Sequence, residues 1–183
     1  MIKKYRLLFC NSTLPSKGIV DSQSVKNTDC ASKKHKGFDG GKKVGGIKRH
    51  IITDTNGLPL AIDITPANQG ERDICYHLLL NHNENELLEQ LDEVYGDTGY
   101  QGERFQFGVY QDTGILITVV PRKQDTQHEF HIVPKRWIVE RSFSWLDKCH
   151  RLWKNTERLQ NTSKAMIELV FIRLLAKRMG NMG

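Results

Sequence analysis

Apolar and polar residues alternate in several short stretches of the chain, as they do in β-strands that bury one face. The first stretch runs from Ile19 to Val25. The next two, residues 47–54 and 58–65, flank Asn56-Gly57, a dipeptide that favours a tight hairpin turn. Two more predicted strands follow, at residues 93–97 and in the β-branched run 115–120.

Helical patterns occupy the segments between and after these strands. Residues 73–91 have the length and apolar spacing of a helix, and the pattern leaves open whether they form one helix or two. Further helices are predicted at residues 101–110, from Pro134 to about Lys154, and from the cap at Asn161-Thr162-Ser163 to Met179. The order βββαβαβα, followed by an extra C-terminal helix, predicts an α/β protein with a mixed central sheet flanked by helices.

The two ends of the chain differ in character. The last predicted helix is apolar on most sides and must pack against something, either the core or a second subunit. Charged residues such as Glu168 and Arg173 interrupt it, which argues against a membrane segment. Residues 1–18 show no clear periodicity and are expected to be a linker or a residual N-terminal segment. The ordered domain is therefore expected to span residues 19–179.

Composition narrows the class of partner. The chain has 183 residues, with 27 basic and 21 acidic side chains, a net charge of +6 and a pI near 9.2. This balance favours a polyanionic partner, and no apolar run is long enough to cross a membrane. The four cysteines form no CxxC pair, which indicates free thiols in a reducing cytoplasm rather than a zinc ribbon or redox motif.

Three acidic residues are candidates for one metal site. Asp21 lies in the middle of the first predicted strand and Asp97 at the C-terminal end of strand 93–97. Adjacent pairing of these strands would bring the two carboxylates together, and a divalent cation would relieve their repulsion. Glu140 lies on the helix after Pro134. Taken singly, each acid is also compatible with an ordinary solvated or ion-paired residue.

The helix that carries Glu140 has one polar and one apolar side. Helical spacing aligns a polar stripe of Arg136, Glu140, Ser144, Asp147, Lys148 and Arg151. The opposing apolar stripe contains Ile138, Trp145, Cys149 and Leu152. We therefore expect the helix to pack through its apolar side and to present Glu140, with cations that could hold phosphates, to the site.

Several sequence blocks resemble one family. The blocks are VDSQSVKN, GFDGGKKVGGIKRHIITDTNGLPLAIDITPAN, YGDTGYQG, RWIVERSFSWLDKCHRLWKNTER and TSKAMIELVFIRLLAKRM. From about Ile19 to Met179 they resemble, in order, the DDE transposases of bacterial insertion sequences, of the insertion-sequence-five type. The resemblance implies a ribonuclease-H-like fold and an enzyme that cuts DNA at element ends and transfers the strands to target DNA.

The resemblance also implies the roles of individual residues. Asp21, Asp97 and Glu140 match the three catalytic acids, which would hold two magnesium ions, with manganese as a substitute. Arg136 matches the arginine four positions before the glutamate, and Lys148 is the nearest candidate for the basic residue that follows it. The residues expected to contact the DNA backbone are Lys33, Lys34, Lys36, Lys42, Lys43, Lys48, Arg49, Arg136, Lys148 and Arg151.

The expected partners follow from the same resemblance. They are the terminal repeats of the element, target DNA and a second copy of the chain on paired ends, in a bacterial cytoplasm at the nucleoid. Family members carry a helical N-terminal region before the first aspartate, whereas only 20 residues precede Asp21 here. The N-terminal DNA-binding domain is thus expected to be absent.

The short N-terminal part leaves alternatives open. The chain is either the product of a downstream reading frame, normally joined to an upstream product by frameshifting, or a truncated remnant. A truncated chain could be a catalytically silent fragment that only binds DNA or oligomerises. Val133 replaces a tyrosine common in the family, and Asp147 occupies the usual position of the trailing lysine.

Overall fold

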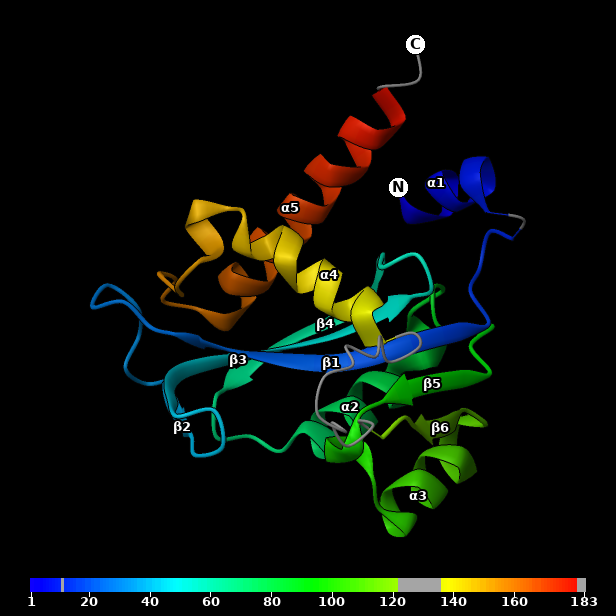
Figure 1. The fold of residues 1–183 in the computed structure, drawn as a ribbon, viewed down its shortest axis with the longest axis horizontal. Coiled ribbons are helices and arrows are strands. Elements are labelled where there is room, and N and C mark those ends of the chain that lie inside the picture. Colours follow the sequence, from blue (N-terminus) through cyan, green and yellow to red (C-terminus); the bar gives the residue numbers. More distant parts are fainter. Residues whose placement is uncertain (11, 122–135, 181–183) are drawn as a thin grey trace, which may run out of the picture.

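A six-stranded mixed sheet lies at the centre of the molecule (Figure 1). The structure is a computed structural model that describes residues 1–10, 12–121 and 136–180. Its strands are β1 (Lys17–Lys26), β2 (Gly37–Asp39), β3 (Val44–Asp54), β4 (Pro59–Pro66), β5 (Glu93–Gly96) and β6 (Leu116–Val119). The order across the sheet is β2-β3-β1-β5-β6, and β4 also pairs with β3.

Strand pairing explains why the sheet is mixed. β1 and β3 are antiparallel from Gly18 opposite Asp54 to Lys26 opposite Gly46. β1 and β5 are parallel, and so are β5 and β6. Along its other edge β3 pairs antiparallel with β2 at its beginning and with β4 over the rest of its length. The expected mixed α/β architecture is confirmed.

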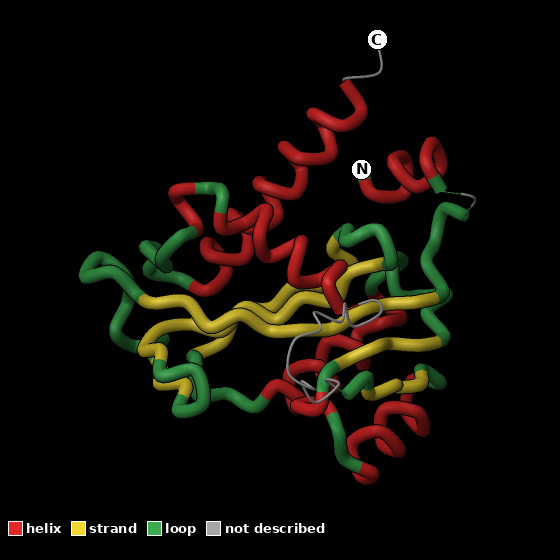
Figure 2. The backbone as a smooth tube through the Cα atoms, in the orientation of Figure 1, coloured by secondary structure: helices red, strands yellow, loops and turns green. Residues whose placement is uncertain are grey.

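Helices cover both faces of the sheet (Figure 2). The α-helices are α1 (Ile2–Phe9), α2 (Glu71–Leu80), α3 (Glu103–Thr113), α4 (Arg136–Asp147) and α5 (Gln160–Gly180). Short 3-10 helices are η1 (Asn81–Glu84), η2 (Thr98–Tyr100) and η3 (His150–Leu152). α4 and α5 pack on one face, whereas α2 and α3 pack on the other.

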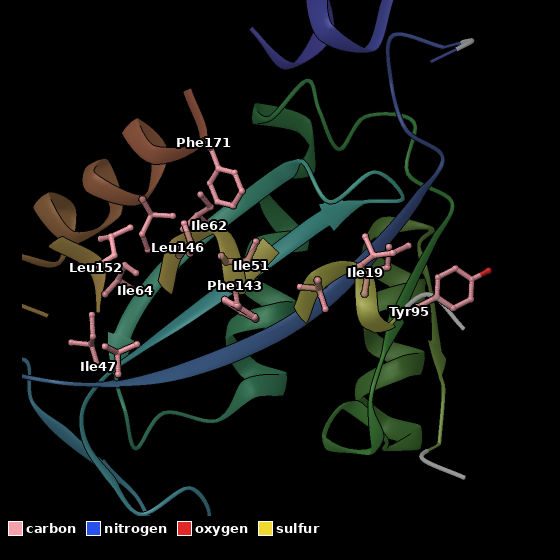
Figure 3. Packing of buried hydrophobic residues seen from close by; sticks show 14 residues of the cluster. Ile19, Ile47, Ile51, Ile62, Ile64, Tyr95, Phe143, Leu146, Leu152 and Phe171 are labelled. Carbon is pink, nitrogen blue, oxygen red and sulfur yellow. The ribbon is translucent and has the colours of Figure 1, made fainter. Parts of the chain in front are cut away.

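The two faces form separate cores because successive strand residues point to opposite sides. Ile19 and Ile51 pack with Phe143 of α4 and Phe171 of α5 (Figure 3). Their chain neighbours point the other way, so that Val20 packs against α2 and α3. In β1, the side chains of odd-numbered residues therefore point towards α4 and those of even-numbered residues towards α2.

Most predicted elements are present, with shifted ends. The hairpin of β3 and β4 forms as expected, and Gly57 adopts a φ of 80° in its turn, a conformation that favours glycine. In place of the helix predicted over residues 73–91, α2 begins two residues earlier, at Glu71, ends at Leu80 and is followed by η1. The predicted helix to about Lys154 ends instead at Asp147. β2 lies in the lysine- and glycine-rich segment between the first two predicted strands, where no strand was predicted.

The N-terminal segment forms a helix, α1, where the pattern predicted none. Its leucines and Phe9 are largely exposed, so apolar periodicity gives no signal. Arg6 instead inserts between α1 and the sheet and forms a buried ion pair with Asp54.

The longest helix, α5, buries Ile167, Phe171 and Leu175 and exposes Leu169 and Ile172. The expectation of a packed helix is thus confirmed. Within the described ranges, no helix is long and apolar enough to cross a membrane. All four cysteines are free thiols.

Candidate active site

Asp21 lies in the middle of β1, on the face covered by α4. Its partner in the antiparallel ladder is Ile51 of β3. Because Asp21 has the same parity as Ile19, which packs into the core beneath α4, its side chain points towards that layer. The residue is half-buried.

Asp97 directly follows β5 and comes to lie beside Asp21. The parallel register places Ile19 opposite Tyr95, and each aspartate lies two residues further along its strand. Both aspartates line the same small hollow, together with Tyr95, Gly96 and Val120. The Asp97 carboxylate also accepts a hydrogen bond from the Gly99 amide at 2.8 Å, which caps η2. The expected adjacency of these two strands is confirmed.

Tyr100 supports the hollow from the α2 side of the sheet. A Cβ atom on Gly96 would lie 2.8 Å from its ring, so only glycine permits this close packing. Burial raises the pKa of the Tyr100 phenol well above 10, and the charges of Asp21, Glu71 and Asp97 add to the rise. Its hydroxyl has no hydrogen-bond partner within the described part of the chain.

Glu140 lies on the solvent side of α4. The helix packs through Ile138, Val139 and Phe143, which are buried, whereas Glu140 is exposed. In the ranges that the structure describes, no three His, Cys, Asp or Glu side chains are arranged to hold a metal ion. The fold thus brings Asp21 and Asp97 into one hollow. Among the described residues, Glu140 does not form a metal-binding group with them in this arrangement.

The polar stripe of α4 is exposed as expected at Glu140, Ser144, Asp147 and Lys148. Asp147 ties the end of the helix to β1, because Gln23 Nε2 donates to both of its carboxylate oxygens at 3.0 and 3.1 Å. Arg151 lies beyond the helix, in η3, and pairs with Glu157 at 2.7 Å. The side chain of Arg136 and the whole of Val133 lie outside the described residues.

Two residues expected to contact DNA are buried instead. Arg49 is 1% exposed, and it donates to Gln23 Oε1 at 3.1 Å and to the Leu152 carbonyl at 2.6 Å. Lys48 is 6% exposed, and its Nζ lies 3.4 Å from Asp39. In this conformation both side chains connect internal segments and are buried, and their contact with a DNA backbone stays a prediction.

The five lysines between β1 and β3 that were expected to contact DNA are exposed. They are Lys33, Lys34, Lys36, Lys42 and Lys43. Lys42 differs from the rest because its Nζ also donates to the Ser22 carbonyl at 3.0 Å. An exposed basic surface thus remains next to the strand that carries Asp21.

Comparison with known proteins decides the family. A family model described as "Transposase DDE domain" matches residues 12–175. The chain belongs to this family. A curated relative, the putative transposase for insertion sequence element IS402 of Burkholderia cepacia, is 33% identical over 129 residues. The match covers 68% of this chain and 60% of the relative, so the chain spans less than two thirds of that protein. No solved structure gives a significant match.

Glu71 is a fourth acid that the sequence analysis missed in this DDE domain. It is the first residue of α2, where an acid is usually explained by the helix dipole, so no pattern marks it as part of the site. A Cβ atom on Gly99 would lie 2.9 Å from Glu71 Oε2 and 2.9 Å from Asp97 Oδ1. Glu71 Oε2 and Asp97 Oδ1 both lie 2.9 Å from this one position, so the distance between them is at most the sum of the two values.

Proposed function

We propose that this chain is the catalytic domain of an insertion-sequence transposase, which cuts DNA at element ends and joins the strands to target DNA. The observation that carries the proposal is the meeting of Asp21 and Asp97 in one hollow of a DDE-family domain. The curled mixed sheet with helices on both faces is compatible with a ribonuclease-H-like fold, which we propose for the domain.

The acids fit a site for divalent cations. Asp21 and Asp97 line one hollow and offer hard oxygen donors, and a divalent cation bound between such carboxylates would relieve their repulsion. Glu140 lies on α4, the helix that covers the face of the sheet carrying Asp21. We propose that it is the third ligand of two magnesium ions, with manganese as a substitute. Bound ions would supply an activated nucleophile and stabilise the leaving oxygen.

The proposed reaction consists of two phosphoryl transfers. In the first, water attacks a phosphodiester at the element end, the P–O3′ bond breaks, and a DNA 3′ hydroxyl is released. In the second, that hydroxyl attacks a target phosphodiester and displaces a new 3′ hydroxyl. Asp21 and Asp97 hold the reaction centre, and exposed lysines such as Lys33 and Lys34 hold the DNA backbone.

The proposed partners complete the assembly. They are the terminal repeats, target DNA, a second copy of the chain on paired ends and, where the element has two reading frames, an upstream product. The proposed location is the bacterial nucleoid. A catalytically silent chain that only binds DNA or oligomerises is the alternative outcome of the test.

The test is cleavage of end-containing DNA in magnesium or manganese, comparing wild type with Asp97→Ala. We expect wild type to nick and the variant to be at least about 100-fold slower. Asp63→Asn, an acid of β4 outside the hollow, is the control and keeps wild-type activity. Equal rates for wild type and Asp97→Ala would refute the proposal. A wild type that stays inactive with an upstream product supplied would favour the silent chain.

A further inference from the structure

A network of charged and hydroxyl groups contacts β1 on the α2 face of the sheet, opposite the face that carries Asp21. Ser22, the next residue, has the opposite parity, so its side chain points to the α2 face. There the Ser22 hydroxyl donates a hydrogen bond to Glu71 Oε1. Asp21 and its immediate support thus lie on opposite faces of the same strand.

The same network also contacts the turn between β2 and β3. We define the basic turn as residues 40–43, which connect β2 to β3. Lys42 Nζ lies 3.0 Å from the Ser22 carbonyl oxygen, 3.3 Å from the Ser22 hydroxyl and 3.4 Å from Glu71 Oε1. Asp39 fixes the start of the turn by accepting from the Gly41 and Lys42 amides, both at 3.0 Å.

Buried partners make this arrangement specific. Ser24 donates to Asp39 at 2.6 Å, and Lys48 Nζ lies 3.4 Å from Asp39 and 3.8 Å from Glu71. Burial alone would raise the pKa of Glu71, but the Ser22 hydroxyl and the charges of Lys42 and Lys48 lower it. Glu71 therefore stays ionised at neutral pH and can attract Lys42.

Glu71 lies between the basic turn and the segment that follows Asp97. Through Oε1 it holds Ser22 and Lys42, and its Oε2 lies on the side of Gly99 and Asp97. We propose that Glu71 is a positioning residue that fixes the basic turn against β1 beside Asp21, so that DNA held by the turn meets the acids in one geometry. This inference rests on the proposed function.

A closely matched ion pair provides the control. Lys42 and Glu71 are 3.4 Å apart with side chains 44% and 22% exposed, and Lys17 and Glu93 are 3.4 Å apart with side chains 48% and 22% exposed. Glu93 begins β5, whereas Asp97 follows the end of that strand. Glu93→Gln therefore removes the same kind of pair without touching the basic turn.

The test combines amide hydrogen exchange with DNA cleavage by the full chain. In Glu71→Gln, exchange at the Gly41 and Lys42 amides should accelerate about tenfold, because a charge-assisted contact that closes the turn is lost. Lys42→Met should accelerate exchange at least as much, because Lys42 also loses its contacts with Ser22, and the double variant should add little to Lys42→Met. Cleavage by Glu71→Gln should lose about tenfold in kcat with KM unchanged or lower, because removing a negative charge does not weaken DNA attraction.

The outcomes separate the two proposals. Glu93→Gln should match wild type in both measurements. Unchanged exchange in Glu71→Gln, or equal acceleration in Glu93→Gln, would overturn the positioning role. A higher KM with kcat unchanged would also overturn it and would assign Glu71 to ground-state DNA binding. A wild type that stays inactive with an upstream product supplied would count only against the transposase proposal, since the exchange measurement needs no activity.

Discussion

Arg6 of α1 and Asp54 at the end of β3 form a buried ion pair. Asp54 is fully buried, and its other carboxylate oxygen accepts from the Asn56 and Leu58 amides at 2.8 Å. One carboxylate thus shapes the turn between β3 and β4 and also anchors the first helix.

Arg6→Ala should destabilise the protein by about 3 kcal/mol, because it leaves the Asp54 carboxylate buried without its counter-charge. Urea unfolding followed by circular dichroism measures this loss. Lys3→Ala is the control, because Lys3 forms an exposed pair with Glu86 and such pairs contribute little. If the two variants unfold at the same urea concentration, α1 is not anchored by Arg6.

His50 should make stability depend on pH below neutrality. Burial, together with the charges of Lys48 and Lys42, lowers its pKa from 6.5 to about 4, against the opposing charge of Glu71. Between these values the unfolded chain binds a proton that the folded chain does not, so stability is complete above pH 6.5 and falls as the pH approaches 4. The full loss is about 3 kcal/mol.

The measurement is the free energy of unfolding from pH 7.5 to 5, above the range in which Glu71 and other carboxylates with a lowered pKa contribute. His50→Gln should flatten the profile in this range, because the side chain can still bond Thr65 but no longer titrates. Asp39 does not interfere. Burial alone would raise its pKa, but the bonds from Ser24 and the Lys42 amide and the charge of Lys48 lower it to about 2. A wild-type profile as flat as that of His50→Gln would contradict the buried, neutral histidine.

Arg49 and the surface lysines should behave in opposite ways. Arg49→Met should cost about 3 kcal/mol of stability, because Gln23 and the Leu152 carbonyl lose a buried donor. The double variant Lys33→Ala, Lys34→Ala should unfold like wild type and should lower the salt slope of DNA binding by about two. Thermal unfolding and binding titrations at several salt concentrations distinguish these effects. A reduced salt slope in Arg49→Met with unchanged stability would contradict the internal role of Arg49.

Tyr100→Phe should stabilise the protein by about 1 kcal/mol, because it removes a buried hydroxyl that the described structure leaves without a partner. Tyr95→Phe is the contrasting variant, since the Tyr95 hydroxyl donates to Glu93 and its loss should be neutral or destabilising. Thermal unfolding of both variants provides the measurement. Destabilisation by Tyr100→Phe would mean that its hydroxyl is satisfied in solution.

The strands were predictable because each follows from a local pattern, whereas the grouping of the acids depended on the family resemblance and on an assumed pairing of two distant strands. Alternation around Ile19 and Ile51 fixed the parity of β1 and β3, and parity places Asp21 towards α4. Strand length placed Asp97 at the end of β5. Pairing of β1 with β5 then follows from the general layout of such sheets.

The features that were missed depend on contacts between distant segments. α1 is anchored by Arg6 on Asp54, which no periodicity within residues 1–18 can show. Arg49 has the sequence context of a DNA-binding cation, and only the fold shows that it donates a hydrogen bond to the carbonyl of Leu152, over one hundred positions later. Glu71 belongs to the site only because Ser22 and Lys42 converge on it.

The parallel pairing of β1 with β5 has a consequence for when the acid pair exists. Lys17 pairs with Glu93, so this contact closes a loop that contains the whole β2–β4 and α2 region. Contacts of such long sequence separation form slowly compared with local ones. A chain still emerging from the ribosome, or one partly unfolded, carries Asp21 without Asp97 beside it. The two carboxylates are thereby brought together only once the sheet is complete.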